Sequence, residues 1–122
     1  MDCAPNPNQC GGTGGCDGAT AEVAFDYVAN ARGWATEKTY PYKGFDWHCD
    51  FDDEMPAAVT LSGFEVVKSN DLEAFQEALM NVGPLAIAVA AEPWMYYQGG
   101  VFDKCTGDKG SDIDHGVQVV GW

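Results

Sequence analysis

Basic residues are scarce in this sequence. Lysine and arginine together number 6 against 19 aspartates and glutamates, which gives a formal net charge of −13 at pH 7. A chain of this charge repels the phosphates of nucleic acids and of anionic membrane surfaces. We therefore expect no nucleic-acid partner.

Long apolar runs are absent as well. The longest, residues 83–91, is about half of the ~20 residues that a membrane-spanning helix needs. An acid and prolines follow Met1, where a secretion signal would have a basic and then an apolar stretch. We expect neither a transmembrane segment nor a signal peptide within these residues, and any leader was removed or lies outside them.

Motifs for several kinds of chemistry are also missing. There is no C-x-x-C pair for zinc, and the adjacent His48 and Cys49 are poorly spaced for one chelate. No G-x-S-x-G marks a serine nucleophile. The glycines of GGTGG suggest a phosphate loop, but Asp17 stands where glycine is required and no G-K-[ST] follows. We interpret GGTGG as a tight loop and expect no metal and no cofactor.

Cysteines, in contrast, are numerous. Five in a short chain are typical of an oxidising compartment, and their odd number leaves at least one thiol free or paired outside the chain. The pairing of Cys10, Cys16 and Cys105 stays open at this stage. Their full set is Cys3, Cys10, Cys16, Cys49 and Cys105.

The elements predicted from the sequence indicate an α+β fold in two parts. Residues 1–56 contain a loop, a helix at 20–33 that Gly33 ends, and coil at 36–56. Residues 57–122 contain strands and one helix at 70–82, which Asn70 caps with Glu73 three residues later. The predicted strands are residues 59–67, 85–91, 101–105 and 115–122, with a turn at 92–100.

His115 is the histidine whose surroundings suggest chemistry. It opens an apolar strand, where an imidazole could act as a general base, although a structural histidine is the alternative on spacing alone. Asp112 and Asp114 lie close to it in sequence, but a third metal ligand is not evident.

Five segments, in order along nearly the whole chain, resemble the papain-like cysteine peptidases of the cathepsin L type. The segments are GGCDGATAEVAFDYVA, TYPYKG, NVGPLAIAVAA, WMYYQGGVFDKC and DIDHGVQVVGW. The resemblance implies a papain-like two-domain fold, incomplete here, with part of the helical left domain in residues 1–56 and part of the β-rich right domain in residues 57–122.

The resemblance also assigns roles to single residues. His115 corresponds to the catalytic histidine, which draws a proton from a nucleophilic thiol. Gly18 and Ala19 fall on the loop that pairs with an extended peptide substrate. Cys3 and Cys49 correspond to the partners of one disulfide. Thr20, Ala21, Ala88, Ile113 and Gly116 fall on positions that line the pocket for the side chain two residues before the cut bond, and Asp114 is a further predicted substrate-binding residue.

Departures from the family pattern limit what this chain does by itself. The nucleophile motif C-G-[SA]-C-[WY] does not occur in it, and neither does the glutamine of the oxyanion hole. The resemblance places the disulfide partners of Cys16 and Cys105 outside the chain, and it gives Cys10 no counterpart. The family usually has glycine at the position of Ala19. We therefore expect these 122 residues alone to be inactive.

Two interpretations follow from these matches and departures. In the first, the chain is the middle segment of a lysosomal, vacuolar or secreted cysteine endopeptidase that hydrolyses peptides with a nucleophile outside this chain. In the second, it is a truncated, non-catalytic subunit of a larger assembly in an oxidising compartment. A protein partner would then cover its exposed apolar faces.

Overall fold

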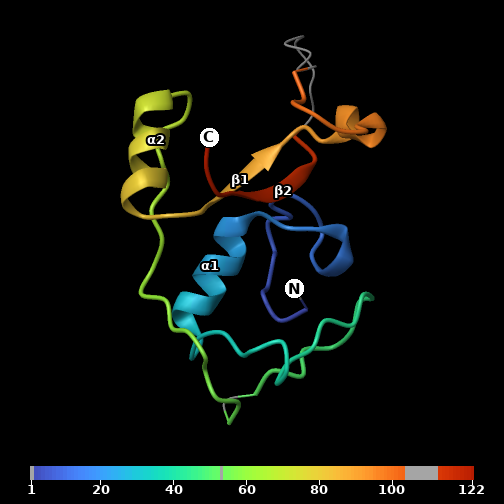
Figure 1. Cartoon of the computed structure of the whole chain (residues 1–122). Helices are drawn as coiled ribbons and strands as arrows, with labels where there is room; N and C mark the ends of the chain where they lie inside the picture. The colour runs from blue at the N-terminus through green and yellow to red at the C-terminus, as the bar shows by residue number, and fades with distance from the viewer. Residues whose placement is uncertain (1, 53, 104–112) are drawn as a thin grey trace. The chain divides into compact units, whose positions relative to one another are not determined.

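The computed structural model describes residues 2–52, 54–103 and 113–122. It divides into two compact units, Met1–Val66 and Val67–Trp122, each of which is described by itself below. The sequence places the change of composition after residue 56, and the assignment of residues 1–56 and 57–122 to two domains stays a prediction. Figure 1 gives the order of the elements along the chain.

The first unit is built around a single helix, α1, which spans Ala21–Asn30 (Figure 1). This confirms the helix predicted from apolar residues at helical spacing. The predicted apolar face is only partly covered: Val28 is buried and Phe25 half-buried, but Ala21 and Ala24 are exposed. The ring of Phe25 lies 6.2 Å from that of Trp34 and 5.9 Å from that of Phe64, so aromatic contacts hold this side of the helix.

Gly33 allows the chain to turn back sharply after α1. Its φ is +115°, and a Cβ at this buried position would overlap the carbonyl oxygen of Val59. Only glycine permits so close an approach of two backbones at a positive φ. The next residue, Trp34, then forms an isolated antiparallel bridge with Val59.

That bridge replaces the strand predicted at residues 59–67, and the prediction was wrong. The β-branched and aromatic residues of VTLSGFEVV predict a strand, but only Val59 finds a backbone partner. Gly63, at φ +151°, interrupts the segment. Strand propensity alone does not form a strand where no second backbone lies alongside.

A loop precedes α1, and coil follows Trp34, as predicted. The loop contains one turn of 3-10 helix, η1, at Gly15–Asp17. A disulfide joins Cys3 in the loop to Cys49 in the coil, with an S–S distance of 2.01 Å. The disulfide therefore links the loop before α1 to the coil after it.

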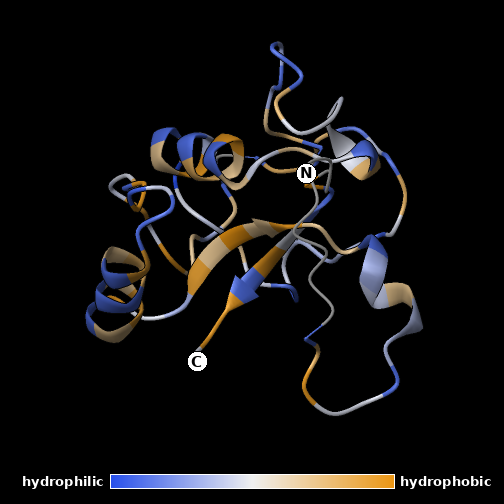
Figure 2. Ribbon diagram, turned by 90° about the horizontal axis from the view of Figure 1, so that it is seen from above, coloured by the Kyte–Doolittle hydropathy of each residue, from blue (hydrophilic) through white to orange (hydrophobic). Residues whose placement is uncertain are grey.

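The second unit consists of α2 at Leu72–Asn81, β1 at Leu85–Val89, η2 at Glu92–Tyr96 and β2 at His115–Val119 (Figure 1). The helix and both strands confirm predictions, and η2 lies within the predicted turn. β1 and β2 form a two-stranded antiparallel sheet, with Leu85 opposite Val119 and Val89 opposite His115. Figure 2 shows β1 as an apolar strand, whereas polar residues interrupt β2.

Two details of the second unit differ from the sequence predictions. Asn70 does not cap α2; it has φ +58°, and Asp71 is the N-cap, whose side chain accepts a hydrogen bond from the N–H of Ala74. The capping-box spacing counted from Asn70 was therefore shifted by one residue. The strand predicted at residues 101–105 is not present at 101–103, and residues 104–105 lie outside the described residues.

Removing the cap of α2 tests this arrangement. We expect Asp71→Ala to lower the thermal unfolding midpoint by a few degrees, because the first turn of the helix loses a hydrogen-bond acceptor. Hydrogen bonds from Lys68 and from the Ala74 N–H lower the pKa of Asp71. The stabilisation is therefore present above the ordinary aspartate pKa and lost as the pH falls through the folded-state value.

Asn70→Gly is the matched control for this experiment. Glycine accepts the positive φ of residue 70 and leaves the cap intact, so this variant should keep its stability. Equal losses in the two variants, or no loss in Asp71→Ala, would show that Asp71 is not the cap.

Candidate functional site

His115 is the first residue of β2, opposite Val89 on β1. Its side chain is exposed and makes no hydrogen bond or ion pair with the part of the chain that the structure describes. An accessible imidazole on a regular strand is held by its backbone, while its ring nitrogens remain available for chemistry.

Asp114 fixes the backbone immediately before this histidine. Its N–H donates to the carbonyl oxygen of Val89 at 3.1 Å, and its Oδ1 accepts from the N–H of Ala91 at 2.7 Å. These two bonds continue the β1–β2 pairing past the last ladder position. The carboxylate of Asp114 is thus engaged with backbone, and through it the entry of the chain into β2 is held in place.

The predicted pocket residues of the second unit do not all lie on the face of the sheet that carries His115. Ala88 and Gly116 are direct cross-strand partners. Because side chains alternate along a strand, these two positions share the face opposite to that of His115 and Val89. Ile113 precedes the strand and is 63% exposed. The structure therefore brings Ala88 and Gly116 together.

The first unit holds the other predicted substrate-binding residues, in one continuous run from Gly18 to Ala21. Gly18 is tied into the loop, since its carbonyl oxygen accepts from the N–H of Gly14 at 2.9 Å. Thr20 is the N-cap residue of α1, and its N–H donates to the carbonyl oxygen of Cys10 at 3.1 Å. Ala21 opens the helix and is exposed.

Ala19 differs from its neighbours in this run. It is exposed, and neither its N–H nor its carbonyl oxygen takes part in the backbone hydrogen bonds of the loop. Free backbone N–H and carbonyl groups are what a peptide needs in order to pair with a segment as an added strand. This run and the residues around His115 belong to different units and are described separately.

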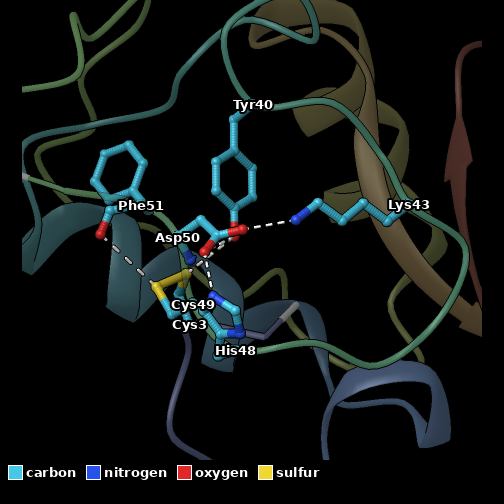
Figure 3. The surroundings of a disulfide bond; sticks show 7 residues. All are labelled: Cys3, Tyr40, Lys43, His48, Cys49, Asp50 and Phe51. Atoms are coloured by element: carbon cyan, nitrogen blue, oxygen red, sulfur yellow. Dashed lines mark hydrogen bonds and ion pairs between the residues drawn. A yellow bond between two sulfur atoms is a disulfide. The ribbon is translucent and has the colours of Figure 1, made fainter.

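The disulfide lies within a cluster of polar and aromatic side chains that the sequence did not reveal (Figure 3). Asp50, next to Cys49, pairs with Lys43 at 2.6 Å and with His48 at 2.5 Å, one through each carboxylate oxygen. The hydrogen bond from Lys43 is the main cause that lowers the pKa of Asp50. The hydroxyl of Tyr40 lies 3.6 Å from the sulfur of Cys3. His48 therefore has a structural partner, unlike His115.

Two cysteines, Cys10 and Cys16, are free and exposed among the described residues, and Cys105 lies outside them. The backbone N–H of Cys16 donates to Asp46 at 2.5 Å. Loss of solvation at the sulfur, followed by the hydrogen bond and charge of Asp46, raises the pKa of the Cys16 thiol. A raised pKa lowers the fraction of thiolate, which is the reactive form of cysteine.

Within the described residues, no group of three or more His, Cys, Asp or Glu side chains is placed to hold a metal ion. No helix in that part of the chain has the length and apolar character that crossing a membrane requires.

Comparison with known proteins assigns the family. Residues 1–122 match the papain family of cysteine proteases along their whole length. This chain belongs to the papain family. Vignain of Ricinus communis is 36% identical over 124 residues, covering 100% of this chain and 32% of that protein. Cathepsin L of Sarcophaga peregrina is 36% identical over 113 residues, covering 91% of this chain and 33% of that protein.

Solved structures of the family agree with the incomplete papain-like fold expected from the sequence. The digestive procathepsin L 3 of Tenebrio molitor larval midgut superposes with a TM-score of 0.81 at 34% identity, covering 98% of this chain and 37% of that one. The digestive procathepsin L2 proteinase of the same tissue superposes with a TM-score of 0.77 at 35% identity, covering 98% of this chain and 36% of that one. The chain thus spans about a third of the length of its papain-family relatives.

The electrostatic control of Cys16 can be tested by alkylation. Asp46→Asn should lower the pKa of the Cys16 thiol and so speed its reaction with iodoacetamide at neutral pH, because a neutral amide no longer disfavours the thiolate. Mass spectrometry of peptides containing Cys16 measures the rate. Glu22→Gln removes an acid that does not act on Cys16 and should leave the rate unchanged; a rate unaltered in Asp46→Asn would contradict the assignment.

The role of Asp114 can be tested by hydrogen exchange. Asp114→Ala should speed exchange of the Ala91 N–H, which loses its acceptor, and Asp114→Asn should preserve protection because an amide oxygen still accepts. Residue-resolved NMR provides the rates. Unchanged protection of Ala91 in the alanine variant would mean that the side chain does not hold the two segments together.

Proposed function

We propose that this chain is a segment of a papain-like cysteine endopeptidase, and that it carries the general base and part of the substrate-binding surface. The observation that supports this most directly is His115, whose exposed imidazole has no partner among the described residues while Asp114 and β1 hold its backbone. A general base needs this combination of fixed position and free nitrogens.

In the proposed reaction the nucleophilic thiol comes from outside this chain. None of the five cysteines is followed by tryptophan or tyrosine, as the nucleophile motif requires, and the raised pKa of Cys16 argues against it as a substitute. His115 takes the proton of the thiol, and the thiolate attacks the peptide carbonyl carbon. The imidazolium then protonates the leaving amine, and the acyl group remains on sulfur as a thioester.

Water completes the proposed cycle. His115 removes a proton from water, and the resulting hydroxide attacks the thioester carbonyl. The carbon–sulfur bond breaks, releasing the carboxylic acid product, and the thiolate–imidazolium pair is restored for the next substrate. One histidine therefore serves as both acid and base in the two half-reactions.

The proposed substrate is an extended peptide that pairs with the backbone at Gly18 and Ala19. The free N–H and carbonyl groups of Ala19 support this pairing, which binds peptides with little dependence on their sequence. Selectivity would come from small or apolar side chains at the proposed substrate-binding positions, which favour a bulky apolar residue two positions before the cut bond. These positions are Thr20, Ala21, Ala88, Ile113 and Gly116, and Asp114 is a further proposed substrate-binding residue.

We also propose that the protein works in an oxidising compartment, in a lysosome, a vacuole or outside the cell. The disulfide between Cys3 and Cys49 supports this placement, since such bonds are rarely stable in a reducing cytosol.

A chimeric enzyme tests the catalytic proposal. Residues 1–122 would replace the matching segment of cathepsin L of Sarcophaga peregrina, which supplies the remaining two thirds of a family member. The chimera should cleave a fluorogenic peptide that has phenylalanine two residues before the cut bond. His115→Gln should lower kcat/KM by about 10²–10⁴-fold, the usual contribution of general acid–base catalysis.

The control is His48→Gln, which removes the other histidine of the chain and should leave cleavage unchanged. Full activity of the His115→Gln chimera would exclude His115 as the base. Cleavage by the 122-residue chain alone would instead overturn the proposal that the nucleophile lies outside it. A folded chimera that binds peptide but never cleaves it would favour a non-catalytic binding subunit.

A further inference from the structure

Asn6, in the loop that precedes α1, makes an unusual number of contacts with the backbone. Its Nδ2 donates to the carbonyl oxygens of Cys10 at 3.2 Å and Gly12 at 2.8 Å, and its Oδ1 accepts from the N–H of Cys10 at 2.9 Å. One amide side chain thus uses both its donors and its acceptor to hold the turn at residues 10–12. We propose that Asn6 is a positioning residue. It holds in place the segment Gly18–Thr20, called the run below, which contains the proposed peptide-pairing residues Gly18 and Ala19.

The link from the turn to that run begins with a hydrogen bond. The carbonyl oxygen of Cys10, which Asn6 contacts, also accepts from the N–H of Thr20 at 3.1 Å. Thr20 directly follows Ala19, whose free backbone groups are the proposed peptide-pairing site. A single carbonyl group, that of Cys10, therefore connects the side chain of Asn6 with the run proposed to pair with peptide.

Close backbone packing forms a second link between the turn and the run. Gly12 has φ +143°, and a Cβ on it would overlap the carbonyl oxygens of Asp17 and Gly18. The carbonyl group of this same Gly12 accepts the shorter of the two bonds that Asn6 donates. Because the glycine backbone lies directly against that of Asp17 and Gly18, a shift of the turn displaces the start of the run.

Backbone hydrogen bonds also hold the turn: the N–H of Gln9 donates to the carbonyl oxygen of Asn6 at 3.1 Å, and the N–H of Gly12 donates to that of Gln9 at 3.4 Å. A concavity of about 490 Å³ lies between it and α1, lined on one side by Pro5 to Asn8 and Cys10 and on the other by helix residues that include Tyr27. Apolar packing against the helix is therefore incomplete at this point. Cys10 is a free thiol among the described residues, so no disulfide within them fixes the turn. The three side-chain hydrogen bonds of Asn6 therefore act together with these backbone bonds to hold the turn.

This inference rests on the proposed function for the identity of the run as a peptide-binding edge. Its structural content, that Asn6 controls the conformation of Gly18–Thr20, is independent of catalysis. Two readouts on the 122-residue chain separate these parts. Hydrogen exchange without peptide reports the conformation, and NMR titration with a capped hexapeptide carrying leucine at its second and third positions reports binding at Ala19.

Asn6→Ala should speed exchange of the Thr20 N–H and weaken peptide binding by about fivefold to tenfold, the effect of losing one or two net hydrogen bonds. The amide of Val28 within α1 should keep its protection, which shows that the helix remains folded. The matched control is Asn8→Ala, a nearby asparagine that borders the same concavity and makes no side-chain hydrogen bond among the described residues. It should behave like the unmodified chain.

A second variant decides the outcome if Asn6→Ala loses its fold. Asn6→Asp keeps an acceptor for the N–H of Cys10 but cannot donate to the carbonyl oxygens of Cys10 and Gly12. It should protect the Cys10 N–H while Thr20 exchanges faster than in the unmodified chain.

The inference is overturned if both Asn6 variants match Asn8→Ala, to within about twofold, in Thr20 exchange and in peptide affinity. If the unmodified chain shows no peptide-induced shift at Ala19, the peptide-binding part of the proposed function fails. The exchange rates then still decide whether Asn6 controls the run.

Discussion

Buried apolar side chains are few in this structure, and that shortage determines how the rest of it is held. Among the described residues, Val28 and Leu79 are the buried hydrophobic side chains. Small amounts of buried apolar surface supply little free energy to offset the entropy of ordering long loops. Side chains that hydrogen-bond to distant backbone groups, together with one disulfide, fix the irregular parts of the chain in place of a large core.

The candidate site follows the same principle. The position of His115 depends on a sheet of only two strands, which Asp114 extends by bonding to Ala91. The run at Gly18–Thr20 depends on backbone contacts with a glycine-rich turn. In both units the chemically useful group is left free while its immediate neighbours in sequence are tied down. Loss of solvation at the sulfur, together with the nearby carboxylate of Asp46, raises the pKa of Cys16 and so disfavours its thiolate.

Much of the fold could be predicted from the sequence because its regular elements have strong local signals. Apolar residues at helical spacing predicted α1 and α2, and short apolar runs predicted β1 and β2. The predictions failed where contacts with other segments, or the conformation of an adjacent residue, determine the local structure. Residues 59–67 have the composition of a strand but lack a partner beyond Trp34, and the cap of α2 moved to Asp71 because Asn70 adopts a left-handed conformation.

Candidate site residues could be named from the sequence only where a family motif marks them. The motif around His115 predicts the role of this histidine, and β2 confirms the strand predicted there. The contacts of Asn6, the pairing of Cys16 with Asp46, and the Lys43–Asp50–His48 cluster were not predicted. They join residues of irregular segments, for which neither periodicity nor propensity indicates which side chains meet.

The disulfide between Cys3 and Cys49 has a consequence for cleavage of this chain by a protease. The two cysteines are separated by 46 positions, an interval that contains all of α1 and the run at Gly18–Thr20. Hydrolysis of a single peptide bond anywhere in this interval would leave both pieces covalently joined. A chain cut in this way would separate into two fragments only after treatment with a reductant, so the segment Gly18–Thr20 would stay attached to the rest of the unit.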